Sequence, residues 1–336
     1  MIDQSGPSGE QFSLAAGPYT AAVTQAGATL RCLEYDGRPL IIGFEEHQMC
    51  SAGRGQNLIP WPNRIRDGRY TFAGVERQLP ISEVARHNAS HGLVRWAMWS
   101  PTQVSKDQVS LQLRLMAQPG YPWSLGWQLD YRLDESGLSV SVTARNESAE
   151  LAPYAYGAHP YLSAGSERID SDLLTFGAST QVVTDNERLL PVEVPANHLD
   201  FSRGRALGSQ ALDTAFGGLT SQRVQLRGEH GGVELWADDS IRWWQLYSAD
   251  DNPSLARRAL AVEPMTAPPD AFNSGTDLIV LIWMVLSSQT RVRRKSFSRM
   301  SKSSTMFFGS LTDKEPPHFP TRFAMAFPLL FNDRQN

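Results

Sequence analysis

The stretch Val109-Ser110-Leu111-Gln112-Leu113-Arg114-Leu115 indicates the fold class, because apolar residues occupy every second position and alternate with polar ones. Side chains of a β-strand point alternately to opposite faces, so this pattern predicts a strand with one buried and one solvent-facing side. Leu138-Ser139-Val140-Ser141-Val142 repeats the pattern, and Asp134-Glu135-Ser136-Gly137 before it has the chemistry of a hairpin turn. These segments predict long antiparallel strands.

Strand patterning continues outward from this region along most of the chain. Residues 223–227 and 233–237 form a second predicted pair around Gly228-Glu229-His230-Gly231-Gly232. No helix-period stretch of comparable length, no internal repeat and no alternation of strands with helices is visible. With 336 residues and 41% hydrophobic content, the chain can bury a large core in one main domain. A mostly β, antiparallel architecture is predicted.

Composition excludes several classes of partner. The net charge of -4 provides no basic surface of the kind that nucleic acid selects. Two cysteines, Cys32 and Cys50, cannot form a disulfide framework, and the N-terminus lacks the charged and apolar regions of a signal peptide. The apolar run Leu278 to Leu286 is far shorter than the roughly 20 residues that span a bilayer. We expect a cytoplasmic monomer or weak dimer with no nucleic acid or membrane partner.

Two short motifs place titratable residues before prolines. Tyr156-Gly157-Ala158-His159-Pro160-Tyr161 contains a histidine, and Ala261-Val262-Glu263-Pro264-Met265-Thr266 contains a glutamate. These side chains ordinarily titrate near about 6.5 and 4.3, and burial can bring them toward neutral pH. Proline biases the residue before it toward an extended backbone. The motifs suggest an acid and base pair, although such prolines can also simply end strands.

A third group of motifs adds Asn57-Leu58-Ile59-Pro60-Trp61-Pro62-Asn63-Arg64-Ile65, then Asp67-Gly68-Arg69-Tyr70-Thr71-Phe72, then His91-Gly92-Leu93-Val94-Arg95. With all of these in this order, the chain resembles the aldose 1-epimerase family, also called galactose mutarotases, over about residues 20–281. The resemblance implies a large antiparallel β-sandwich, the galactose mutarotase-like supersandwich. It also implies interconversion of the α and β anomers of a free hexose, glucose or galactose, with no cofactor and no metal.

The resemblance also implies roles for six residues. Glu263 is expected to be the general base at the C1 hydroxyl and His159 the general acid at the ring oxygen, meeting across one pocket with room between them for a pyranose. Arg64, His91 and Asp213 are expected to bind sugar hydroxyls, and Asn63 to hold its loop. From the residues alone, Arg64 could equally be a surface charge, Asp213 a cap and His91 a loop histidine.

Other interpretations of the same residues stay open. His87 and His91 have the spacing of two metal ligands on a helix, but Asn88, Ser90 and Gly92 disfavour a helix and no third ligand is near, so we expect no metal site. A noncatalytic carbohydrate-binding protein on the same fold remains an alternative. So does a hexose-6-phosphate 1-epimerase, which would need cations such as Arg54, Arg86 and Arg95 for the phosphate. Four aromatic residues are expected mainly in the core, with a sugar platform as the alternative: Trp61, Tyr121, Trp123 and Trp127.

The charge changes sign after residue 281. Residues 282–336 contain nine Lys or Arg and three Asp or Glu, a charge of +6, whereas residues 1–281 carry -10. The strand pattern also stops, so we expect a sandwich domain over 1–281 and an atypical basic tail over 282–336, frameshifted or disordered. A tail that binds an acidic partner, a membrane-associating extension and a shifted reading frame are the three explanations. We favour the shifted frame, which predicts a sandwich without its last strand unless Ile282 to Leu286 supplies one.

Overall fold

The computed structural model describes residues 6–193, 198–229, 231–282 and 285–295. Strands dominate these ranges, and the helical elements in them are short: α1 (Ala271–Ser274) and the 3-10 turns η1 (Val84–Arg86) and η2 (Ile169–Ser171). These described helices fall short of the length and apolar character that crossing a membrane requires. The mostly β fold class predicted from the alternating pattern is confirmed.

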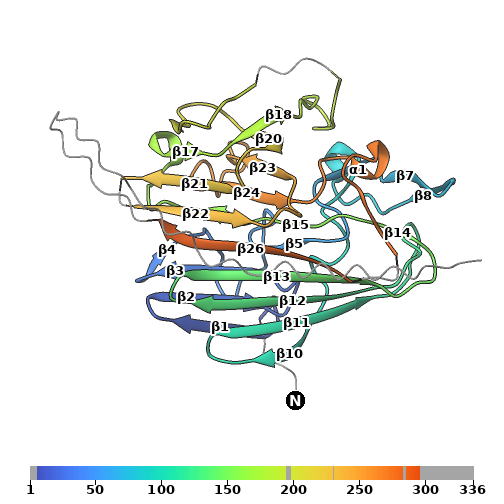
Figure 1. Cartoon of the computed structure of the whole chain (residues 1–336), viewed down its shortest axis with the longest axis horizontal. Coiled ribbons are helices and arrows are strands. Elements are labelled where there is room, and N and C mark those ends of the chain that lie inside the picture. The colour runs from blue at the N-terminus through green and yellow to red at the C-terminus, as the bar shows by residue number, and fades with distance from the viewer. Residues whose placement is uncertain (1–5, 194–197, 230, 283–284, 296–336) are drawn as a thin grey trace, which may run out of the picture. The chain divides into compact units, whose positions relative to one another are not determined.

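A nine-stranded sheet forms one layer of the sandwich (Figure 1), and its neighbouring strands are all antiparallel. Its order is β10-β11-β12-β13-β26-β22-β21-β17-β19. The bounds are β10 (Ser100–Val104), β11 (Gln108–Leu115), β12 (Leu125–Asp134), β13 (Gly137–Asn146), β26 (Val285–Lys295), β22 (Gly231–Ala237), β21 (Arg223–Gly228), β17 (Leu173–Thr175) and β19 (Arg205–Ala206).

The hairpins of this sheet follow from the sequence. Asp134 pairs with Gly137 across the turn between β12 and β13, and β21 and β22 close with Gly228 opposite Gly231. Along β12, buried residues alternate strictly with less buried ones, because successive side chains point to opposite faces of the sheet. The predicted hairpins at 134–137 and 228–232 are therefore both present.

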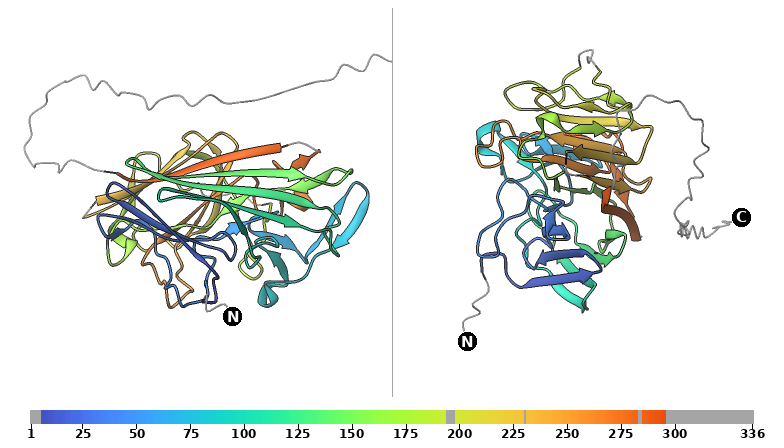
Figure 2. Two further views of the ribbon diagram at one scale, coloured as in Figure 1. Left: turned by 90° about the horizontal axis from the view of Figure 1, so that it is seen from below. Right: turned by 90° about the vertical axis from the view of Figure 1, so that its left-hand side faces the viewer.

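The remaining strands form a seven-stranded sheet, a four-stranded sheet and three two-stranded ones, seen from two further directions in Figure 2. The seven-stranded sheet contains β18 (Ala178–Gln181), β20 (Asp213–Leu219), β23 (Trp243–Tyr247), β24 (Leu260–Met265), β15 (Gly157–Ala158), β5 (Asn57–Leu58) and β16 (Tyr161–Leu162), with β16 paired to β24. The four-stranded sheet contains β1 (Gln11–Ala16), β2 (Tyr19–Thr24), β3 (Leu30–Tyr35) and β4 (Arg38–Pro39). The pairs are β14 (Ala152–Tyr154) with β25 (Ile279–Leu281), β6 (Arg64–Arg66) with β9 (Asn88–Ser90), and β7 (Arg69–Phe72) with β8 (Val75–Gln78).

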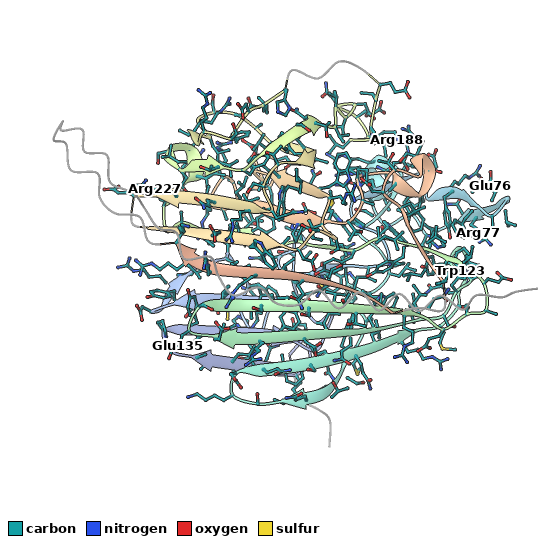
Figure 3. All side chains as sticks on the ribbon, in the orientation of Figure 1. Glu76, Arg77, Trp123, Glu135, Arg188 and Arg227 are labelled. Carbon is teal, nitrogen blue, oxygen red and sulfur yellow. The ribbon has the colours of Figure 1, made fainter. Side chains whose placement is uncertain are left out.

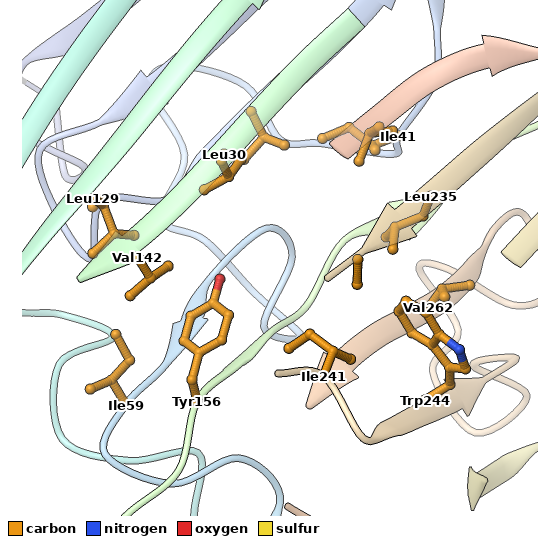
Figure 4. Close-up of a cluster of buried hydrophobic side chains, with 14 of the residues drawn as sticks. Leu30, Ile41, Ile59, Leu129, Val142, Tyr156, Leu235, Ile241, Trp244 and Val262 are labelled. Carbon is orange, nitrogen blue, oxygen red and sulfur yellow. The ribbon is translucent and has the colours of Figure 1, made fainter. Parts of the chain in front are cut away.

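One large hydrophobic core joins these sheets (Figure 4). Leu129 and Leu235 enter it from the nine-stranded sheet, Leu30 from the four-stranded sheet, and Trp244 and Val262 from the seven-stranded sheet. All five are buried, and removing apolar surface from water stabilises the fold by about 25 cal/mol per Å². The core therefore fixes the seven-stranded sheet that carries the candidate site.

The four aromatic residues considered above, Trp61, Tyr121, Trp123 and Trp127, are all buried members of this core. Trp123 is capped by the Arg77 guanidinium, 4.6 Å from the ring centre, where the β7–β8 hairpin meets the body of the protein (Figure 3). All four side chains therefore pack in the core rather than form a platform for a sugar.

Strand β26 corrects the domain boundary that was expected after residue 281. It lies in the middle of the nine-stranded sheet, with Leu138 to Arg145 of β13 on one side and Gly232 to Ala237 of β22 on the other. Buried Ser288, Thr290 and Val292 alternate with exposed Ser287 and Gln289. The sequence does not reveal this alternation, because two of the three inward residues are polar.

The basic residues of β26 pair with acidic residues elsewhere in the sandwich. Arg291 Nη2 lies 2.8 Å from Asp134 Oδ1, and Arg293 Nη2 lies 2.8 Å from Glu234 Oε1. Burial alone would raise the pKa of Glu234, but the charges of Arg293 and Lys295 outweigh burial and hold the pKa below its usual value. The pairing of β26 on both sides argues against a change of reading frame before Lys295. The hypothesis of a shifted frame is therefore restricted to residues 296–336, which lie outside the described residues.

Candidate active site

Three adjacent strands of the seven-stranded sheet bring polar side chains to one face. In the register of β23 and β24, Gln245 lies opposite Glu263, and in that of β20 and β23, Asp213 lies opposite Tyr247. Alternate residues of one strand share a face, so Gln245 and Tyr247 point to the same side as their partners. Gln245 Nε2 donates a hydrogen bond of 2.5 Å to Asp213 Oδ1. The sheet thereby holds Asp213 next to Glu263.

His159 reaches the same face from a connection between two short strands. β15 and β16 precede and follow it, and both pair with β24, so the histidine lies beside the strand that carries Glu263. His159 Nε2 lies 3.3 Å from Glu263 Oε1, and the two side chains are only 7% and 3% exposed. The structure brings the pair into contact. It leaves no space for a sugar ring between these two atoms, so a bound ring must lie across the pair, on its cleft side.

The position of His159 depends on close packing around its ring. The ring stacks on Tyr161, with 5.0 Å between centres and 23° between planes. On another side, a Cβ added to Gly53 would lie 2.9 Å from His159 Cδ2, and Gly53 has a φ of +73°. Glycine is needed there because any larger residue would press on the imidazole and strain the backbone.

Asn63 and His91 hold two loops together. The Asn63 backbone N–H donates to His91 Nδ1 at 3.2 Å, and the His91 backbone N–H donates to Asn63 O at 2.8 Å. Because Nδ1 accepts this bond, the proton of the neutral ring sits on Nε2. Burial lowers the pKa of His91 well below its usual value, and the charges of Arg95 and His159 act in the same direction. His91 therefore offers a neutral N–H donor.

Arg64 is held by two acids. Its Nε and Nη2 lie 2.8 and 3.0 Å from the two carboxylate oxygens of Glu83, a bidentate arrangement that fixes the plane of the guanidinium. Its Nη1 lies 3.9 Å from Asp213 Oδ2. Arg64 is thus a positioned donor rather than a surface charge, and Glu83 is a positioning residue that the sequence motifs did not reveal.

A cleft of about 360 Å³ opens beside these residues. All six residues predicted from the sequence line it, namely Asn63, Arg64, His91, His159, Asp213 and Glu263. Arg86, Arg95, Tyr247 and the rim residue Trp96, which is 53% exposed, line it as well. Arg54 does not belong to this lining; its guanidinium donates instead to Gly43 O and Ser51 Oγ, within its own loop.

One wall of the cleft includes Leu189, which the neighbouring Arg188 ties to the body of the protein. Arg188 Nη2 donates to Asp67 Oδ1 at 2.8 Å and to Asn88 Oδ1 at 3.1 Å. Figure 3 labels Arg188 at the upper right of the molecule. No local sequence signal predicts this contact, because Arg188 and Asp67 are far apart in the chain.

Burial shifts the pKa values of both His159 and Glu263. It lowers the pKa of His159 to about 4 and raises the pKa of Glu263 well above its usual value, and the Asp213 carboxylate adds to the second effect. Removal from water disfavours the charged form of each group. Burial therefore favours the neutral form of each group, whereas the roles expected from the sequence need a protonated histidine and an ionised glutamate.

His87 and His91 do not form a pair of metal ligands. Asn88–Ser90 is strand β9, and His87 points elsewhere, with Nδ1 3.1 Å from Asp67 Oδ1 on the surface. Within the part of the chain that the structure describes, no three His, Cys, Asp or Glu side chains are arranged to hold a metal ion.

Comparisons with known proteins assign the family. Residues 10–282 match the family described as aldose 1-epimerase. The chain belongs to this family. It is 37% identical over 281 residues to the uncharacterised protein YihR of Escherichia coli K12, covering 82% of this chain and 89% of that protein. It is also 26% identical over 209 residues to galactose mutarotase of Rattus norvegicus, covering 58% of this chain and 60% of that protein.

Solved structures of this family have the same fold. A GalM/aldose epimerase homologue from C. elegans superposes with a TM-score of 0.76 at 19% identity, covering 85% of this chain and 99% of that one. A putative aldose 1-epimerase from Escherichia coli K12 gives 0.74 at 21%, covering 86% and 99%. These similarities establish the galactose mutarotase-like β-sandwich predicted from the sequence.

Proposed function

We propose that this protein is an aldose 1-epimerase that opens and recloses the ring of a free sugar by general acid and base catalysis. The observation that carries the proposal is the 3.3 Å contact between His159 Nε2 and Glu263 Oε1, buried at a cleft with hydroxyl-binding side chains. Ring opening removes a proton from the C1 hydroxyl and adds one to the ring oxygen. Two adjacent groups that share one proton suit both transfers.

We take the roles of Glu263 and His159 from the family resemblance, and with these roles the protons balance. Transfer of the shared proton within the pair gives ionised Glu263 and protonated His159. As the bond between C1 and the ring oxygen breaks, Glu263 takes the C1 hydroxyl proton and His159 gives its proton to the ring oxygen. This leaves the neutral pair, which burial favours. After rotation about the C1–C2 bond, His159 takes the proton back, Glu263 returns its own, and the other anomer forms.

The remaining lining residues bind the sugar in this proposal. The Arg64 guanidinium and the His91 Nε2–H donate to hydroxyl oxygens, and the Asp213 carboxylate accepts from hydroxyl protons. Asn63 holds the loop, as its mutual bonds with His91 require. Donors and an acceptor of fixed direction can orient a pyranose over the pair.

The direct test is polarimetry. Freshly dissolved α-D-glucose or α-D-galactose should approach its equilibrium optical rotation faster with the protein than without it, in proportion to protein concentration. A noncatalytic carbohydrate-binding protein would bind the sugar and leave the rate unchanged. An unchanged rate with both sugars, and with the charged aldoses considered below, would therefore reject the enzymatic function.

The pH profile should reflect the pair rather than isolated residues. Below the lowered pKa of His159, about 4, the histidine gains the second proton of the pair and no base remains, so kcat falls as pH decreases through this value. Near neutral pH kcat should be flat, and it falls again only when the raised pKa of Glu263 is passed. NMR exchange between anomers, with circular dichroism to exclude acid unfolding, measures the profile. An acid limb near the ordinary histidine value of about 6.5 would contradict it.

A further inference from the structure

Arg95 stands out among the charged residues of the cleft because it has no partner. Within the described residues, its side chain has no hydrogen bond or ion pair, although it is half-buried and lines the cleft. Burial also lowers the pKa of its guanidinium from the usual value, while leaving it charged at neutral pH. A partly buried cation without an anion is costly, so its retention needs a reason.

The carboxylates of the same cleft are all engaged elsewhere. Glu83 binds Arg64 and Arg86. Asp213 accepts a hydrogen bond from Gln245 and lies near Arg64. Asp251 accepts a hydrogen bond from the Tyr247 hydroxyl, and Glu263 contacts His159. Among the described arginines of the cleft, Arg95 is therefore the one that has no carboxylate partner. An anion that enters the cleft would supply the direct partner that Arg95 lacks.

The position of Arg95 indicates which part of a sugar it faces. It follows His91 in the same loop, and the His91 ring lies 5.6 Å, centre to centre, from the His159 ring. Gln56 joins the two loops, because its Nε2 donates to Arg95 O at 3.1 Å and its carbonyl oxygen accepts from the His159 N–H at 3.0 Å. The Arg95 charge accordingly lowers the pKa of both histidines. Arg95 thus lies on the histidine side of the pair, whereas Asp213 is bound to Gln245, the residue opposite Glu263.

In the proposed function His159 serves the ring oxygen and Glu263 the C1 hydroxyl. The ring oxygen of an aldohexose is bonded to C5, which carries C6. A group on the histidine side therefore faces the C6 substituent. We propose that Arg95 binds an anionic group at C6, so that this enzyme prefers a six-carbon aldose with a negative charge there over a neutral hexose. The inference rests on the proposed function and adds its substrate class.

A single charge fits the site best. One guanidinium is unpaired, and it can hold a planar carboxylate or two oxygens of a tetrahedral monoanion by two parallel hydrogen bonds. A phosphate dianion would require a second free cation, whereas Arg64 and Arg86 are already bound to Glu83. A monoanion at C6 is therefore favoured over the phosphate of the hexose-6-phosphate alternative.

The test compares four sugars by NMR exchange between their anomers, after subtraction of the uncatalysed exchange: D-glucose, D-glucuronate, D-glucose 6-sulfate and D-glucose 6-phosphate. The expected result for the wild-type protein is a kcat/KM at least about tenfold higher for glucuronate or the 6-sulfate than for glucose, because a partly desolvated charge pair adds affinity. Arg95→Gln should reduce this ratio at least about tenfold, and Arg95→Lys should restore part of it.

Arg132→Gln is the matched control, because Arg132 is exposed on β12 and lies outside the cleft lining. In this variant the ratio of kcat/KM for the charged sugar to kcat/KM for glucose should not change. The ratio is measured within one protein preparation, so partial unfolding of a variant cancels. Equal or better turnover of glucose, or an equal loss on all sugars in Arg95→Gln, would overturn the inference and leave the epimerase function standing. Preference for the 6-phosphate would overturn the inference that the group at C6 carries a single charge. Catalysis of none of the four, and of D-galactose neither, would reject the proposed function itself.

Discussion

Glu263→Gln should lower kcat by about 10³-fold, within the range that a positioned acid or base contributes. The amide has nearly the shape of the carboxyl group but cannot take the C1 hydroxyl proton. KM should change little, because Arg64, Asp213 and His91 still bind the hydroxyls. Anomer exchange measured by NMR over a range of sugar concentrations separates the two constants.

Folding of this variant should be unaffected. Burial raises the pKa of Glu263 and so favours the neutral carboxyl group in the folded cleft, where a neutral amide costs little. Thermal unfolding of Glu263→Gln should match or exceed that of wild type. Glu76→Gln, on the exposed β7–β8 hairpin labelled in Figure 3, is the control and should keep full activity. Retention of most of the rate in Glu263→Gln would show that another residue is the base.

Thr290→Pro should destabilise the protein by at least about 1–3 kcal/mol, because it removes a ladder N–H and leaves the partner carbonyl unsatisfied. Thr290 lies in the centre of the nine-stranded sheet, opposite Val140 of β13 and Ala237 of β22. Proline has no N–H to donate and is not tolerated between two neighbouring strands. The midpoint of thermal or urea unfolding, together with the soluble yield, measures the effect.

Thr290→Val is its matched control, since valine keeps the β-branched shape and the backbone N–H, and it should unfold close to wild type. The comparison decides whether residues after 281 are part of the sandwich. If Thr290→Pro unfolded within a few degrees of wild type, β26 would not be a structural strand, and a sandwich ending at residue 281 would again be the better description.

The alternating pattern predicted the strands because the two faces of a strand meet different environments, and the pattern records that difference directly. The same logic failed at β26, where buried Ser288 and Thr290 occupy inward positions. Polar residues there hide the period. The acids that neutralise the basic residues of β26, Asp134 and Glu234, lie far away in the chain, so the charge change looked like the end of a domain.

The motifs likewise led to the six cleft residues, since proline-flanked and glycine-containing segments carry recognisable local signals. They did not reveal Glu83 or Gln245, which act on Arg64 and Asp213 through contacts across strands. Arg95 was visible in the sequence, but its lack of a partner was not. Whether a charge is compensated depends on every element packed around it.

The sequence by itself determined the β architecture, the family resemblance and the set of candidate residues, because these depend on local patterning and on motifs that are continuous in the chain. Only the tertiary structure decided that His159 and Glu263 are in contact and buried, that burial favours the neutral form of each, and that β26 completes the central sheet. Burial and charge balance arise from segments brought together by folding, so no local stretch of sequence contains them.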